Sequence, residues 1–91
     1  MRVRVSLASI YREAARAREL DLDLPDGSTV GDLVAKLGEL YGGPFTKLIA
    51  EDGSINREVL LLVNGMSLRK PSFELKDGDF VFISSEVVGG A

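Results

Sequence analysis

The chain has 91 residues, enough for one hydrophobic core but too few for a core and a separate catalytic lobe. Its net charge of -3 at pH 7 excludes a strongly basic protein that binds nucleic acid through a broad positive face. The absence of cysteine and histidine excludes disulfides, thiolate nucleophiles, Cys/His zinc sites and histidine general bases. We therefore expect one folded domain that catalyses little by itself.

The sequence also bears on where the protein resides. No uninterrupted apolar stretch approaches the roughly 18 residues that a membrane-spanning helix needs. The opening residues 1–5 alternate between polar and apolar instead of forming the apolar core of a signal peptide. We expect a cytoplasmic protein with neither a membrane nor a nucleic acid as its partner.

The first quarter of the chain predicts two strands around a short crossing segment. Residues 2–7 alternate with period two, which is typical of a half-buried strand. Residues 10–18 contain helix-forming and charged side chains and favour a short helical or turn-like segment. Residues 20–24 alternate again as a second strand, and Pro25-Asp26-Gly27 then predicts a turn.

The next segment, residues 30–41, has the spacing of the main helix. Apolar side chains recur every three or four residues, and we assign this stripe almost wholly to the core: Val30, Leu33, Val34, Leu37, Leu40 and Tyr41. Ser28 or Thr29 can cap the helix, with Asp32 completing a variant of the capping box. Gly42-Gly43-Pro44 should end it.

Residues 45–57 are irregular and predict a loop with a turn at Asp52-Gly53. Within it, we expect Leu48 and Ile49 to be held against the core.

The remaining residues predict three strands. The continuous apolar run 59–63 suits a central strand that leads into a tight hairpin turn at Asn64-Gly65. A short strand at residues 66–68 should follow, and after a turn at 76–79 residues 80–84 form the last strand. One main helix packed on a mixed sheet of four or five strands is an α+β fold of the β-grasp type. We expect this domain to span residues 1–84 and a flexible tail to span 85–91.

The tail carries two adjacent glycines, Gly89 and Gly90. Because glycine has no Cβ, this pair forms a narrow and pliable segment that can pass through a tight channel into another protein's active site. The alternative interpretation is a frayed chain end, which often contains small residues. The dipeptide alone does not decide between them.

Several motifs in this order resemble the MoaD/ThiS family of ubiquitin-like sulfur carriers, and most closely its molybdopterin synthase small subunits. The resemblance spans nearly the whole chain and rests on five segments: Tyr11-Arg12-Glu13, Pro25-Asp26-Gly27-Ser28-Thr29-Val30, Val63-Asn64-Gly65, Leu75-Lys76-Asp77-Gly78-Asp79 and Val88-Gly89-Gly90. Each motif is weak alone, but the combination is specific.

The resemblance implies a function that depends on partners. An adenylating enzyme of the ubiquitin-activating type would use ATP and magnesium to activate the carboxylate of Gly90, and sulfur would then replace AMP. Val88 and Gly89 would let the tail thread into the partner. The glycyl thiocarboxylate would serve the large subunit of molybdopterin synthase in molybdenum cofactor biosynthesis. The chain itself would bind no cofactor or metal and would not be catalytic alone.

The resemblance also implies a partner-binding patch on the sheet. If Val81 and Ile83 point into the core, then Phe80 and Phe82 lie on the opposite face of the last strand. Ala8 and Met66 would join them. The alternative is the inverted assignment, in which the phenylalanines are ordinary core residues.

Ala91 departs from the family pattern, because sulfur carriers of this family usually end at the second glycine. A processing protease could remove Ala91, the partner could accept an alanyl terminus, or the chain could have lost sulfur carriage; we favour processing. Two other functions stay open. The chain could be a ubiquitin-like modifier or a carrier for transfer-RNA thiolation, or it could be a β-grasp interaction module that carries nothing.

Overall fold

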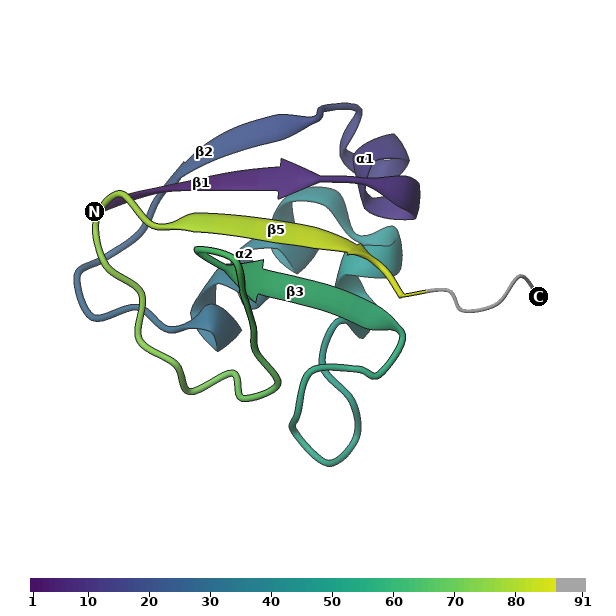
Figure 1. Cartoon of the computed structure of the whole chain (residues 1–91). Coiled ribbons are helices and arrows are strands. Elements are labelled where there is room, and N and C mark those ends of the chain that lie inside the picture. The colour runs from purple at the N-terminus through teal and green to yellow at the C-terminus, as the bar shows by residue number, and fades with distance from the viewer. Residues whose placement is uncertain (87–91) are drawn as a thin grey trace.

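The computed structural model describes residues 1–86, which form one mixed five-stranded sheet with a helix packed across one face (Figure 1). The strands are β1 (Arg2–Leu7), β2 (Glu19–Asp23), β3 (Val59–Val63), β4 (Met66–Ser67) and β5 (Phe80–Ser85). The helices are α1 (Ser9–Ala15), α2 (Val30–Tyr41) and the 3-10 helix η1 (Gly43–Lys47). This α+β arrangement is the predicted β-grasp fold. Within residues 1–86 no helix is both long enough and apolar enough to cross a membrane.

The last strand occupies the middle of the sheet, whose strand order is β2-β1-β5-β3-β4. β5 runs parallel to β1, with Val5 opposite Val81, and antiparallel to β3, with Leu61 opposite Ile83. Residues 59–63 form β3, which is paired on both sides, with β5 and with the two-residue β4, as predicted for a central strand. A parallel pairing between the two ends of a chain leaves no local signal in the sequence.

The main helix begins as predicted, with a reciprocal capping box. Thr29 Oγ1 accepts the backbone N–H of Asp32 at 3.2 Å, and Asp32 Oδ2 accepts the backbone N–H of Thr29 at 2.8 Å. Thr29 is thus the cap, while the hydroxyl of buried Ser28 donates to the Pro25 carbonyl oxygen at 2.7 Å. The helix ends at Gly42, whose φ is 62°.

Fewer residues of the apolar stripe on α2 are buried than predicted. Four of the six stripe residues are buried: Val30, Leu33, Val34 and Leu37. Leu40 is 49% exposed, so its assignment to the core was wrong, whereas Tyr41 is partly buried and packs against the core. Both residues lie in the last turn of α2.

The irregular segment supplies more of the core than expected. Residues 43–47 form η1, which places the Phe45 ring 5.4 Å from the rings of both Tyr11 and Tyr41. Phe45 is 1% exposed, and Leu48 is fully buried while Ile49 packs partly against the core, as predicted. The loop thus closes the end of the core beside α1.

Candidate functional site

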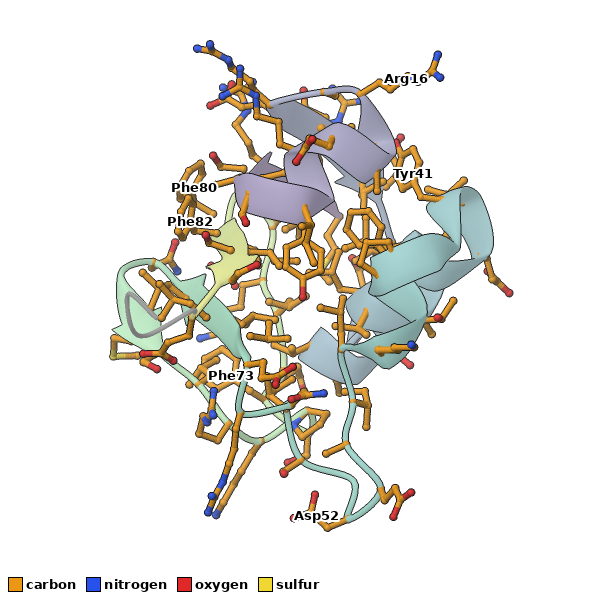
Figure 2. All side chains as sticks on the ribbon, turned by 90° about the vertical axis from the view of Figure 1, so that its right-hand side faces the viewer. Arg16, Tyr41, Asp52, Phe73, Phe80 and Phe82 are labelled. Carbon is orange, nitrogen blue, oxygen red and sulfur yellow. The ribbon has the colours of Figure 1, made fainter. Side chains whose placement is uncertain are left out.

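The predicted face assignment of β5 is correct. Val81 and Ile83 are fully buried beneath the sheet, so Phe80 and Phe82 project from the other face. Phe80 is 39% exposed and Phe82 is half-buried. Figure 2 shows both rings on the side of the sheet away from α2. We call this uncovered side the open face.

Neighbouring strands add apolar side chains to these two rings. Phe82 lies opposite Leu62 of β3, and Leu60 has the same orientation two residues earlier. Both leucines are half-buried, and by strand alternation they lie on the face of the sheet away from α2. We define the open-face patch as Phe80, Phe82, Leu60 and Leu62. A contiguous apolar surface of this kind is typical of a protein-binding site.

Ala8, one of the two further residues predicted for the patch, lies next to this surface. It follows Leu7 in extended conformation, so it has the orientation of Ser6 on the open face, and its N–H donates to the Ile83 carbonyl oxygen at 3.0 Å. Ala8 therefore borders the end of β5, where the tail begins. Its role in binding stays a prediction.

The second, Met66, does not join the open-face patch. It is 57% exposed, but it pairs directly with Val63, whose side chain is buried on the opposite side of the sheet. Directly paired residues of an antiparallel pair point to the same side. The two-residue turn at Asn64-Gly65 imposes this register, so the grouping of Met66 with the phenylalanines was wrong.

Phe80 is held in place by the hairpin turn. The side-chain oxygen of Asn64 accepts the backbone N–H of Phe80 at 3.0 Å, and the backbone N–H of Asn64 donates to the Phe80 carbonyl oxygen at 2.8 Å. The amide nitrogen of Asn64 also donates to Asp79 Oδ1 at 2.9 Å. One asparagine thus fixes both the turn and the start of β5.

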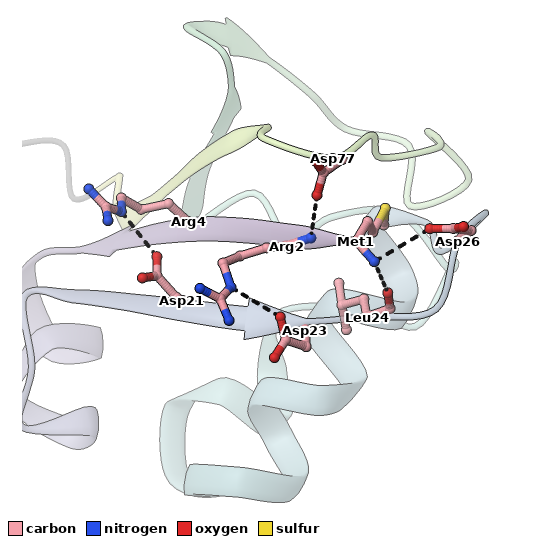
Figure 3. Close-up of polar contacts among 8 residues, drawn as sticks. All are labelled: Met1, Arg2, Arg4, Asp21, Asp23, Leu24, Asp26 and Asp77. Carbon is pink, nitrogen blue, oxygen red and sulfur yellow. Dashed lines mark hydrogen bonds and ion pairs between the residues drawn. The ribbon is translucent and has the colours of Figure 1, made fainter.

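The part of the open face formed by β1 and β2 is polar, and its charged side chains pair with one another. Arg4 Nε lies 3.0 Å from Asp21 Oδ1, and Arg2 Nε lies 3.1 Å from Asp23 Oδ1 (Figure 3). The hydrogen bond from Arg4 lowers the pKa of the Asp21 carboxyl, although both groups are exposed to solvent. Phe80 and the two arginines line the same open hollow of about 490 Å³. This half of the open face can contribute polar contacts at the edge of a docked partner.

The end of β5 is the root of the tail. The strand runs to Ser85, one residue beyond the predicted boundary, and the Glu86 N–H donates to the Glu58 carbonyl oxygen at 2.8 Å. Residues 87–91 lie outside the described part of the chain, so the structure does not locate the predicted tail residues: Val88, Gly89, Gly90 and Ala91. Among residues 1–86 no group of three or more acidic side chains could hold a metal ion.

Comparison with known proteins decides the family. The model of the ThiS family matches residues 5–90. The chain belongs to the ThiS family. This confirms the predicted MoaD/ThiS family of ubiquitin-like sulfur carriers. The match spans the described fold and continues through Gly90.

Three proteins illustrate the similarity of this ThiS-family chain. It is 31% identical to small archaeal modifier protein 3 of Haloferax volcanii, covering 99% of this chain and all of the relative. It is 31% identical over 79% of its length to an Archaeoglobus fulgidus protein named "Putative sulfur carrier protein", 84% of which is covered. The structure of "Putative molybdopterin converting factor, subunit 1" from Pyrococcus furiosus has a TM-score of 0.78 and 28% identity, with 96% and 99% of the two chains covered.

Proposed function

We propose that this chain carries sulfur as a thiocarboxylate on Gly90 and delivers it to the large subunit of a molybdopterin synthase. One observation carries the proposal, namely the ThiS-family match that extends from the β-grasp body through Gly90. The similarity to the Pyrococcus furiosus molybdopterin converting factor subunit supports this acceptor.

The chemistry requires an activating partner. A carboxylate is a poor acyl electrophile, so an adenylating enzyme with ATP and magnesium would join the Gly90 carboxylate to the α-phosphorus of ATP and release pyrophosphate. A sulfur nucleophile would then attack the carbonyl carbon and displace AMP. The chain contributes the carboxylate and no catalytic side chain, which agrees with its lack of cysteine and histidine.

The body of the protein would provide docking. The open-face patch offers apolar surface to the partner, and Ala8 continues it toward the tail root. Four residues separate Glu86 from the end of Gly90, and an extended segment of that length reaches about 14 Å. This reach suffices for a tail that enters a buried site while the sheet stays docked outside.

Two conditions accompany this proposal. Ala91 follows Gly90, so a protease must expose the Gly90 carboxylate before activation. We also expect the activation step to take place in the cytoplasm, where ATP is available.

A second candidate function is protein modification. The same adenylate would lead to an amide bond between Gly90 and a lysine of a target protein. The 31% identity to small archaeal modifier protein 3 over the whole relative favours this alternative. Both functions require a free carboxylate on Gly90.

The first test is the intact mass of the protein recovered from its own cells, with sequencing of the C-terminal peptide. Loss of Ala91 with one sulfur in place of a Gly90 oxygen is expected for the sulfur carrier. Branched peptides in which Gly90 is joined to lysines of other proteins would identify the modifier instead. Ala91 present and sulfur absent in every molecule, with the adenylating enzyme expressed, would refute both.

The acceptor is tested by reconstitution. The thiocarboxylated chain is mixed with the large subunit and a cyclic pterin phosphate, and dithiolene formation is followed. A Phe82→Asp variant should bind the large subunit weakly, because a carboxylate would be buried in the apolar contact. A matched Asp23→Asn variant, on the polar half of the same face, should bind nearly as the unmodified chain does.

A further inference from the structure

The chain enters α1 through a residue with strained backbone. Ser9 has φ of 58°, a left-handed conformation that side chains with a Cβ rarely adopt. The two other such non-glycine residues among residues 1–86 occupy expected places, since Asn64 is in a hairpin turn and Arg16 ends α1. Ser9 is the first residue of a helix, where right-handed angles are the norm. Its strain therefore needs a cause outside the helix.

The left-handed conformation accompanies a hydroxyl contact with the tail root. Ser9 Oγ lies 3.0 Å from Ser85 Oγ, so the two side chains share a hydrogen bond across 76 positions of sequence. Ser85 is the last residue of β5. We call this contact the Ser9–Ser85 pair. Strained residues that persist at a defined contact are candidates for a functional role.

The tail root is thus held on two sides. On one side the Ser9–Ser85 pair joins β5 to α1, and on the other the Glu86 N–H donates to the Glu58 carbonyl oxygen of the segment that precedes β3. Figure 1 shows α1 at the end of the sheet from which the chain continues toward its C-terminus. Ser85 and Glu86, the last two residues before the tail, are therefore tied to the two neighbouring parts of the body, one to each.

We propose that Ser9 and Ser85 are positioning residues that hold the root of the tail during activation by the ATP-using partner. This inference rests on the proposed activation of Gly90. With the pair intact, four residues separate the fixed root at Glu86 from the reacting carboxylate. If Ser85 and Glu86 detach, the free segment grows to six residues. The effective concentration of a tethered group falls roughly as the −3/2 power of tether length, which gives about a twofold loss before any loss of direction is counted.

The test uses the processed chain, ending at Gly90, and the adenylating enzyme from the same cells. ATP–pyrophosphate exchange gives kcat and KM. We expect Ser9→Ala and Ser85→Ala to lower kcat about two- to tenfold, the range that one neutral hydrogen bond supplies. KM should stay within about twofold, because the open-face patch that docks is unchanged. The double variant should be no slower than either single one, and Ser85→Thr, which keeps a hydroxyl, should retain most of the rate.

Ser9→Gly separates positioning from stability. Glycine relieves the left-handed strain, so this variant should be more stable than Ser9→Ala, while both lack the hydroxyl. Positioning predicts equal kcat values for the two. A kcat that follows stability, with Ser9→Gly faster than Ser9→Ala, would overturn the proposal. The control is Ser72→Ala, an exposed loop serine that should keep the original kcat.

A second measurement needs no partner enzyme. Amide hydrogen exchange at Glu86 reports the bond to Glu58, and it should be faster in Ser9→Ala and Ser85→Ala than in the Ser72→Ala control. Unchanged exchange at Glu86 would refute the role of the pair at the tail root. If the unmodified chain is not adenylated at all, the proposed function fails. Hydrogen exchange at Glu86 still tests separately whether the Ser9–Ser85 pair holds the tail root.

Discussion

Replacing Phe45 by leucine tests whether the 3-10 helix η1 contributes to the core. The ring is 1% exposed, and its centroid lies 5.4 Å from those of Tyr11 and Tyr41. Leucine keeps an apolar side chain but loses both aromatic contacts, each worth about 0.5–1.5 kcal/mol beyond the area buried. We therefore expect the free energy of unfolding to fall by about 1–3 kcal/mol. That is a large share of the roughly 5–15 kcal/mol that stabilises a typical domain.

Urea and thermal unfolding, followed by circular dichroism, measure this loss. A change of 1 kcal/mol shifts Tm by about 4–8 °C in a domain of 60–100 residues, so Phe45→Leu should lower Tm by roughly 5–20 °C. The matched control is Phe73→Leu, since Phe73 is 36% exposed in the loop before β5 and should change the stability by less than about 0.5 kcal/mol. Equal losses in the two variants would refute the reasoning.

Three further changes test local features. Asp32→Ala should destabilise the protein by about 0.5–2 kcal/mol in thermal unfolding, because it removes half of the capping box with Thr29, and a neutral result would contradict that role. Arg4→Gln should raise the pKa of Asp21 in an NMR titration. Because that pKa is lowered in the folded state, Asp21 stabilises the fold above its unfolded pKa and loses this contribution as the pH falls through the folded value; an unchanged pKa would disprove the pairing. Gly65→Ala should lower Tm and reduce the free energy of unfolding by about 1 kcal/mol or more, because φ at this position is 86°, which alanine adopts only with strain.

The features that could be predicted from the sequence depend on residues that are close together in the chain. The capping box of α2 depends on Thr29 and Asp32, which are three residues apart, so the chain itself brings them together. The face assignment of β5 depends on alternation within one strand, and the buried Val81 and Ile83 confirm it. Each of these features is complete within a few residues, and a pattern in the sequence can therefore reveal it.

The missed features depend on contacts between distant parts of the chain. Phe45 and Ile55 lie in an irregular segment without periodicity, and they are buried only because that segment folds back over the open end of the core. Met66 was placed on the wrong face because its orientation follows the register set by the turn, not the alternation of its own short strand. The left-handed conformation of Ser9 has no signal in the sequence, since it accompanies a contact with Ser85, 76 positions away.

The position of β5 connects docking to delivery. Phe82 of the open-face patch and Ser85 at the tail root belong to the same strand, three residues or about 10 Å apart. That strand is paired on both sides and is anchored from below by Val81 and Ile83, which are fully buried. A partner that binds the patch therefore also fixes where the tail begins. Under the proposed function a partner supplies the chemistry, and a central last strand that leads directly into the tail then lets the body bind that partner and orient the tail.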